Sequence, residues 1–167
     1  DLSALLRLLQ DSKEKIVTLR KEMEYTDIYI RILKIRYDNS FNVEYDIPEE
    51  LYECKIVKIV LQPIVENAIY HGIKPMEKEG IIKISAKREN DSVIISISDN
   101  GIGMDRKTVE SLNDKMKQVY TEESNNIGLI NVNQRIKLLF GAGNGLWVES
   151  EKNHGTTVFV KIPCDLE

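Results

Sequence analysis

The chain has 167 residues, which is enough for one compact domain or for a small domain with a helical extension. Hydrophobic residues make up 42% of it, charged residues 30%, and the net charge is −4, so the composition is globular and gives no sign of a nucleic-acid-binding surface. No apolar run reaches the roughly 20 residues that cross a bilayer, so no membrane contact is expected from this chain.

The first forty residues carry a heptad-like stripe of mostly apolar positions. These positions recur at alternating spacings of four and three: Leu5, Leu9, Ser12, Ile16, Leu19, Met23, Thr26, Ile30, Leu33 and Tyr37. Such a stripe indicates a helix with a partner. We favour dimerisation over packing of the helix on its own domain. The charged stretch 13–15 could divide the region into two helices, with Thr18 as the N-cap of the second.

Beyond residue 40, strands and helices are mixed without regular alternation. The expected elements are a strand at 41–45 stopped by Pro48, a helix over 55–72 closed by Gly72, strands at 82–86 and 93–97 joined by Asn90-Asp91, a helix over 129–139 stopped by Gly141, and strands near 146–149 and 157–162. The polar, weakly patterned segment 105–126 is predicted to be a lid or a disordered loop. This order predicts an α+β fold: a two-layer sandwich with a mixed, mostly antiparallel sheet, covered by helices on one face and preceded by a helical arm.

The sequence contains two cysteines. Cys54 and Cys164 are far apart in the sequence, and no other Cys or His lies near them at ligand spacing. Neither a zinc motif nor a disulfide framework is predicted, and two free thiols are expected.

Two polar residues are placed where core residues belong. Asn67 lies beside the apolar stripe of its predicted helix, so its amide either bonds a neighbouring loop or offers an oxygen to Mg²⁺. Asp99 follows Val93, Ile95 and Ile97 at steps of two, which puts its carboxylate on the core side of the strand. It could accept from the amine of adenine, or it could simply flank an Asn100-Gly101 hairpin.

Three glycine-containing segments accompany these residues. Gly101-Ile102-Gly103-Met104 would let the backbone approach a flat ligand, and it leads into the polar segment rather than into a returning strand. Asn125-Asn126-Ile127-Gly128-Leu129 precedes a helix, so it is either a phosphate site or an ordinary capped helix start. Gly155-Thr156-Thr157 leads into the last strand, where Thr157 would point into the core beside Asp99 or be only a β-favouring residue.

In this order and spacing, the four segments resemble the nucleotide-binding signature of the GHKL superfamily of ATPases. Val65-Glu66-Asn67-Ala68 is similar to its N box, Asp99–Met104 to its first glycine box, Gly128-Leu129 to its second, and Gly155-Thr156-Thr157 to its final strand motif. The stretches 61–72, 16–25 and 131–135 resemble the LytS/YesM-like sensor histidine kinases. The resemblance covers nearly the whole chain.

The resemblance implies a Bergerat-type pocket for ATP and Mg²⁺. By it, Asn67 coordinates Mg²⁺, Asp99 bonds adenine, Gly101 and Gly103 shape the base pocket together with the neighbouring Met104, and Thr157 lies beside Asp99. His71 would lie near the ribose or phosphates, although it could also be an ordinary histidine near a helix end. Gly128 and Leu129 would border the phosphates, and Glu66 is a tentative catalytic residue. Residues 1–40 would be a dimerisation and phosphotransfer remnant, and residues 41–167 the ATP-binding catalytic domain.

Two departures accompany the resemblance. Asn126 stands where many relatives have a further glycine, which bears on the mobility of the lid. The family's acceptor histidine precedes the region that matches residues 2–7, and this chain has only His71 and His154. The chain is therefore expected to begin after the acceptor, to bind ATP and not to phosphorylate itself.

The leading interpretation is the catalytic domain of a two-component histidine kinase. It would be a cytoplasmic fragment of a membrane-anchored sensor that forms a homodimer through its N-terminal helices and passes phosphate to a response regulator. The alternatives are an ATP-hydrolysing conformational machine and a dimerisation module with a degenerate pocket. The first requires a carboxylate one turn before Asn67, where this chain has Pro63.

Overall fold

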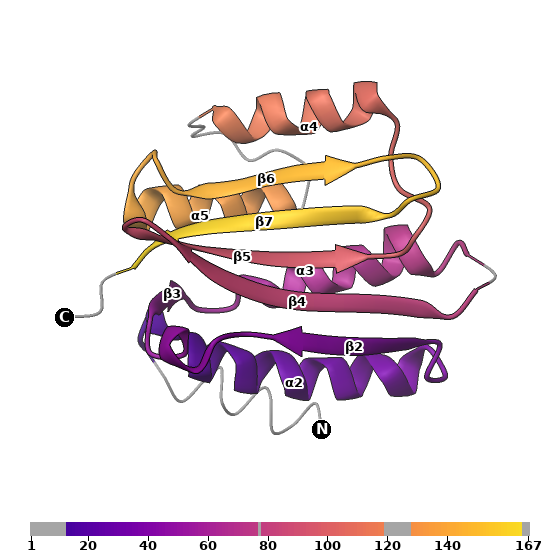
Figure 1. Cartoon of the computed structure of the whole chain (residues 1–167), viewed down its shortest axis with the longest axis horizontal. Coiled ribbons are helices and arrows are strands. Elements are labelled where there is room, and N and C mark those ends of the chain that lie inside the picture. Colours follow the sequence, from indigo (N-terminus) through magenta and orange to yellow (C-terminus); the bar gives the residue numbers. More distant parts are fainter. Residues whose placement is uncertain (1–12, 77, 119–127, 165–167) are drawn as a thin grey trace.

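A computed structural model describes residues 13–76, 78–118 and 128–164. The central sheet has the order β2-β4-β5-β7-β6, with β2 parallel to β4 and all other neighbours antiparallel. Its strands are β2 (Phe41–Asp46), β4 (Gly80–Glu89), β5 (Ser92–Asp99), β6 (Gly145–Ser150) and β7 (Thr156–Pro163). Figure 1 shows α3 (Leu61–Asn67) and α5 (Leu129–Phe140) behind this sheet. The predicted α+β sandwich is confirmed.

The N-terminal helix α2 (Leu19–Arg36) is part of this domain. It begins at Thr18, whose hydroxyl accepts a hydrogen bond from the N–H of Lys21 at 3.2 Å, as the sequence predicts for an N-cap. Four positions of the heptad-like stripe, Leu19, Met23, Ile30 and Leu33, are buried in the domain's own core, whereas Ile16 is exposed. Leu5, Leu9 and Ser12 lie outside the described residues.

Residues 16–18 and 55–57 were both expected to be helical, and both are strands. β1 (Ile16–Thr18) pairs antiparallel with β3 (Lys55–Val57), and the helix α3 begins only at Leu61. Ile59, between the two elements, has a φ of 60°, which a β-branched residue adopts only under constraint. The apolar residues of 55–72 therefore belong to a strand and to a helix. Both elements pack into the same hydrophobic core.

The end of α3 differs from an ordinary helix. Its last turn widens into the π-helical segment η2 (Ala68–Ile73), which contains His71 and Gly72. Single π-helical turns concentrate at functional sites because they shift side chains out of the regular α-helical frame.

The polar segment after residue 104 was predicted to be a lid or loop, and most of it is the helix α4 (Arg106–Lys117). Asp105 caps it by accepting from the N–H of Thr108 at 2.8 Å. Its polar character has a physical reason. The side-chain amide of Asn113 donates to the carbonyl of Val148 and accepts from its N–H, both at 2.8 Å, which satisfies the edge of strand β6. Residues 119–127, including Asn126, lie outside the described part.

The remaining predicted elements are present. Strands β4 and β5 turn at Asn90, whose φ is 56°, and α5 ends at Gly141, whose φ is 99°. Within the described residues, no helix is both long enough and apolar enough to cross a membrane.

The two cysteines are free thiols, as expected, but they are not separate. Their Sγ atoms lie 3.5 Å apart, because the end of β7 reaches the turn before β3. Burial is the main reason why the pKa of Cys54 rises to about 11, which favours the thiol form.

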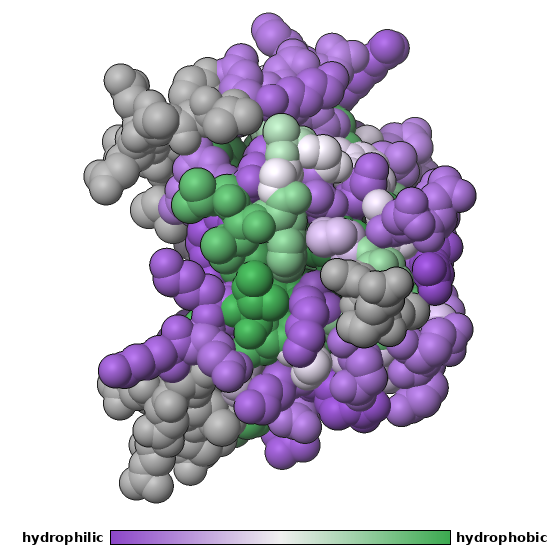
Figure 2. Space-filling model, turned by 90° about the vertical axis from the view of Figure 1, so that its left-hand side faces the viewer, coloured by the Kyte–Doolittle hydropathy of each residue, from purple (hydrophilic) through white to green (hydrophobic). Residues whose placement is uncertain are grey.

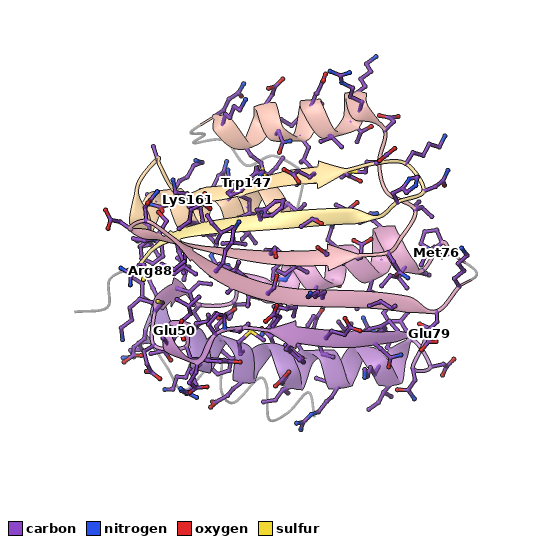
Figure 3. The ribbon with its side chains drawn as sticks, in the orientation of Figure 1. Glu50, Met76, Glu79, Arg88, Trp147 and Lys161 are labelled. Carbon is purple, nitrogen blue, oxygen red and sulfur yellow. The ribbon has the colours of Figure 1, made fainter. Side chains whose placement is uncertain are left out.

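The two ends of the sheet carry different side chains at the surface. In Figure 3, Met76 and Glu79 lie at one end, and Arg88, Lys161 and Glu50 lie toward the other. Figure 2 faces the second end and shows a continuous apolar patch there. The last turns of α5 contain the exposed Leu138 and Leu139, and these residues line a cavity together with Lys13, where the described chain begins.

Candidate nucleotide site

The start of helix α3 is held by a buried carboxylate from α2. Glu22 is fully buried, and its two oxygens accept hydrogen bonds from the backbone N–H groups of Ile59 (2.8 Å), Val60 (3.0 Å) and Leu61 (3.3 Å). From the other side, Arg135 of α5 donates to the carbonyls of Lys58 and Ile59. The strained residue before the helix is thus fixed by two charged side chains.

Burial raises the pKa of Glu22, whereas its three backbone donors and the nearby Arg135 lower it. Burial also lowers the pKa of Arg135, and the Glu22 carboxylate opposes this shift. The three amides at the start of α3 thus provide the hydrogen bonds that a buried carboxylate requires, and they anchor the helix that carries Asn67.

Asn67 lies in the wall between two cavities, at the end of α3. It is half-buried, and its side-chain amide makes no hydrogen bond to another described residue. The alternative that it bonds a neighbouring loop therefore finds no support in the described part of the chain. A half-buried amide oxygen that faces open space is a suitable ligand for a hard cation such as Mg²⁺.

The first cavity, of about 670 Å³, lies between α4 and the end of α3. Its walls contain five of the predicted site residues: Asn67, His71, Gly103, Met104 and Leu129. Helix α4 adds Lys107 and Lys115, two ammonium groups that the sequence analysis did not identify as site residues. Cationic side chains beside an apolar slot are the arrangement that a phosphorylated, ring-containing ligand requires.

The second cavity, of about 500 Å³, lies on the other side of Asn67 and His71. Glu66, Gly128 and Arg135 line it, so two further predicted residues are brought to the same region. Gly128 precedes the first residue of α5 with a φ of 104°, a conformation that favours glycine. The free backbone N–H groups of the first turn of α5 therefore begin at the rim of this cavity.

Asp99 and Gly101 lie behind the first cavity and line neither of the two. The carboxylate of Asp99 accepts from the N–H of Gly101 at 2.8 Å. It also lies against Gly72, because a Cβ on Gly72 would be 2.7 Å from Asp99 Oδ1. A Cβ on Gly101 would in turn meet the backbone of Gly72 at 2.3 Å. The two glycines thus allow the end of α3 to pack directly against the end of β5.

Gly72 was expected only to end a helix, and its position beside Asp99 is a structural feature of the candidate site that the sequence analysis missed. Its carbonyl accepts from the N–H of Ile102 at 3.0 Å, and Ile102 lines the first cavity. The sequence signal that could have indicated this contact is the position of Gly72, five residues after the polar Asn67 of the predicted helix.

Of the two alternatives for Thr157, a position in the core beside Asp99 is wrong. Thr157 pairs with Ser98, and their hydroxyls are 2.8 Å apart on the sheet face opposite to that of Asp99. Thr156 is the residue that pairs with Asp99, and its backbone hydrogen bond lowers the pKa of that carboxyl. The sequence alone does not determine the pairing register, and a shift of one residue exchanges the two faces.

Burial raises the pKa of Asp99 to about 6, against the opposing effect of its hydrogen bonds with Gly101 and Thr156. The folded state then binds this proton more tightly than the unfolded chain does. We therefore expect the free energy of unfolding to fall as the pH rises from about 4, the value of an unfolded Asp, to about 6, and to receive no further change from this group above that. Urea unfolding of the wild type and of Asp99→Asn across this range isolates the contribution. A constant difference between the two proteins would contradict it.

The described residues contain no group of three or more His, Cys, Asp and Glu side chains arranged to hold a metal. A metal ion that binds protein and phosphate oxygens together needs only one or two protein ligands, as Mg²⁺ with a nucleotide does. The amide of Asn67, which has no hydrogen-bond partner among the described residues, is consistent with that kind of site.

Comparison with known families identifies the class of protein. Residues 55–166 match the family described as histidine kinase-, DNA gyrase B- and HSP90-like ATPases, and the chain belongs to it. This agrees with the order of motifs and with the sandwich fold.

Among individual proteins, the chain is 36% identical over 163 residues to the sensor histidine kinase YesM of Bacillus subtilis and 34% identical over 159 residues to the sensor protein LytS of Streptococcus agalactiae. These alignments cover 98% and 93% of the chain but only 26% of each relative. Two solved structures have the same fold, each with a TM-score of 0.60 over 89% of the chain. The catalytic domain of the histidine kinase ThkA is 17% identical and is covered to 95% of its length. The mycobacterial sensor histidine kinase MprB is 14% identical and is covered to 96%. The resemblance to sensor histidine kinases is confirmed.

Proposed function

We propose that this chain is the ATP-binding catalytic domain of a two-component sensor histidine kinase. It transfers the γ-phosphoryl group of ATP to an acceptor histidine outside residues 1–167, from which the group passes to a response regulator. The observation that carries the proposal is the position of Asn67, which lies between two cavities at the end of a firmly anchored helix.

The site residues divide into those for the base and those for the phosphates. Asp99 accepts a hydrogen bond from the exocyclic amine of adenine, and Gly101, Gly103 and Met104 form the surroundings of the base. Asn67 holds Mg²⁺, which neutralises phosphate charge when bound. His71, Gly128 and Leu129 lie toward the ribose and phosphates, where Lys107 and Lys115 provide further positive charge.

A kinase is favoured over an ATP-hydrolysing machine by the residue one helical turn before Asn67. Pro63 occupies that position and lines the second cavity, and it has no group that could activate water. Phosphoryl transfer to a positioned histidine needs mainly orientation and charge neutralisation, which this site can provide. Two cavities that share the amide of Asn67 also favour nucleotide binding over a degenerate pocket.

The partners follow from the same proposal. The full protein forms a homodimer through its N-terminal helices, is anchored in a membrane with this part in the cytoplasm, and binds no nucleic acid. In a solved complex of the kinase ThkA with the response regulator TrrA, 48% of the matched chain has the fold of this chain, with a TM-score of 0.59. This likeness supports a response regulator as partner.

The test uses ATP labelled at the γ-phosphate. We expect the chain of residues 1–167 to bind ATP and Mg²⁺ with a rise in melting temperature, since a ligand specific for the folded state stabilises it. We expect no label on this chain and stable label on a version extended upstream to include the acceptor histidine. No thermal shift at millimolar ATP would refute nucleotide binding, and rapid release of phosphate without labelled protein would indicate a hydrolase.

A further inference from the structure

The second cavity contains a carboxylate whose orientation is controlled from another helix. Glu66 is exposed, precedes Asn67 directly, and lines this cavity with His71 and Arg135. Its Oε2 accepts a hydrogen bond of 2.8 Å from the hydroxyl of Tyr29, 37 residues earlier in the chain. An exposed glutamate normally samples several rotamers, and a fixed donor restricts it to a few.

Tyr29 is a rigid donor. It lies on α2, is half-buried, and packs against the hydrophobic core. Burial first, and then the Glu66 carboxylate, raises its pKa above the ordinary value, so the hydroxyl keeps its proton at neutral pH and donates to Glu66.

Helix α2 is itself fixed relative to the helix that carries Glu66 and Asn67. Glu22, seven residues before Tyr29 and therefore on the same side of α2, binds the three N–H groups at the start of α3. Tyr29 binds near the end of α3. The two contacts set both the position of α3 along α2 and the orientation of the Glu66 side chain.

We propose that Tyr29 is a positioning residue that holds Glu66 toward the acceptor histidine in the second cavity. This inference rests on the proposed function. One imidazole nitrogen of the acceptor attacks the γ-phosphorus as the bond from phosphorus to the bridging oxygen breaks and ADP leaves. The N–H on the other nitrogen is hydrogen-bonded to Glu66, which takes that proton and passes it to water.

The test measures γ-phosphoryl transfer to the upstream-extended chain at saturating ATP. Tyr29→Phe removes only the hydroxyl, and we expect it to lower the transfer rate roughly 5- to 30-fold, the effect of releasing one ordered side chain. The KM for ATP and the melting temperature should change little. Tyr45→Phe is the matched control, because the hydroxyl of Tyr45 also donates to a carboxylate, that of Asp27 on α2, away from both cavities. It should transfer at the wild-type rate.

A double-mutant cycle separates positioning from a merely structural effect. We expect Glu66→Ala to lower the rate and Tyr29→Phe to have no further effect in that background. If Tyr29→Phe slows both backgrounds equally, or if it changes neither, the inference is wrong. If the wild-type extended chain takes up no label while ATP still binds, the proposed transfer reaction fails and the inference with it. If Tyr29→Phe alone has no effect on a labelled wild type, only the positioning role fails.

Discussion

Replacing Glu22 by alanine is expected to lower the free energy of unfolding by about 3–5 kcal/mol, the effect of removing one member of a buried charged network. Three backbone N–H groups lose their acceptor, and Arg135 loses the carboxylate that favours its charged form. Each buried N–H group that is left without an acceptor adds the free-energy cost of its desolvation. Ile59, with its φ of 60°, then lacks part of the framework that holds it.

Urea unfolding measures this effect as a shift of the midpoint at unchanged slope. Glu24→Ala is the matched control, since Glu24 is an exposed glutamate two residues away on the same helix, and it should change the stability by less than about 0.5 kcal/mol. Similar values for the two variants would show that the buried carboxylate contributes nothing. Glu22→Gln should fall between them, because its single amide oxygen can replace only one of two accepting atoms.

Asp99→Asn is expected to lower the affinity for ATP by at least about 10-fold and up to about 150-fold, which corresponds to the loss of a hydrogen bond to a charged group. The asparagine can still accept from the N–H of Gly101, so the fold should remain intact. Because burial disfavours the charge of Asp99, the variant should be as stable as the wild type at pH 7, or more so. Lost binding combined with retained stability distinguishes a ligand-binding carboxylate from a structural one.

Calorimetry with ATP and Mg²⁺ provides the measurement. Asp91→Asn, the same change in the exposed turn before β5, is the control and should bind ATP normally. The affinity of the wild type should also decline as the pH falls below about 6, where Asp99 becomes protonated. Unchanged affinity of Asp99→Asn would overturn the assignment of Asp99 to adenine and leave the family membership untouched.

The structure gives helix α2 a role different from that of a separable arm. Its apolar side lies in the core of the domain, and its Glu22 and Tyr29 both contact the segment 59–66. A displacement of α2 by an upstream region would therefore act directly on the helix that carries Glu66 and Asn67.

Local sequence patterns were sufficient for much of the fold. Alternation identified β2, β4 and β5, because side chains alternate between the two faces of a strand and one face is more buried. Thr18, Gly141 and Asn90 marked boundaries because caps and turns depend on only a few neighbouring residues. The helix α4 was missed since it is mostly polar, and one of its polar residues, Asn113, binds the backbone at the edge of β6.

By itself, the sequence determined the order of the nucleotide-binding motifs and hence the class of protein, because each motif is local. Only the tertiary structure decided which residues those motifs meet. The pairing of β1 with β3, the contacts of Glu22 and Tyr29 with residues 37 or more positions away, and the choice of Thr156 over Thr157 all depend on register between distant segments. Periodicity reports which side of a segment is buried and carries no information about what lies opposite.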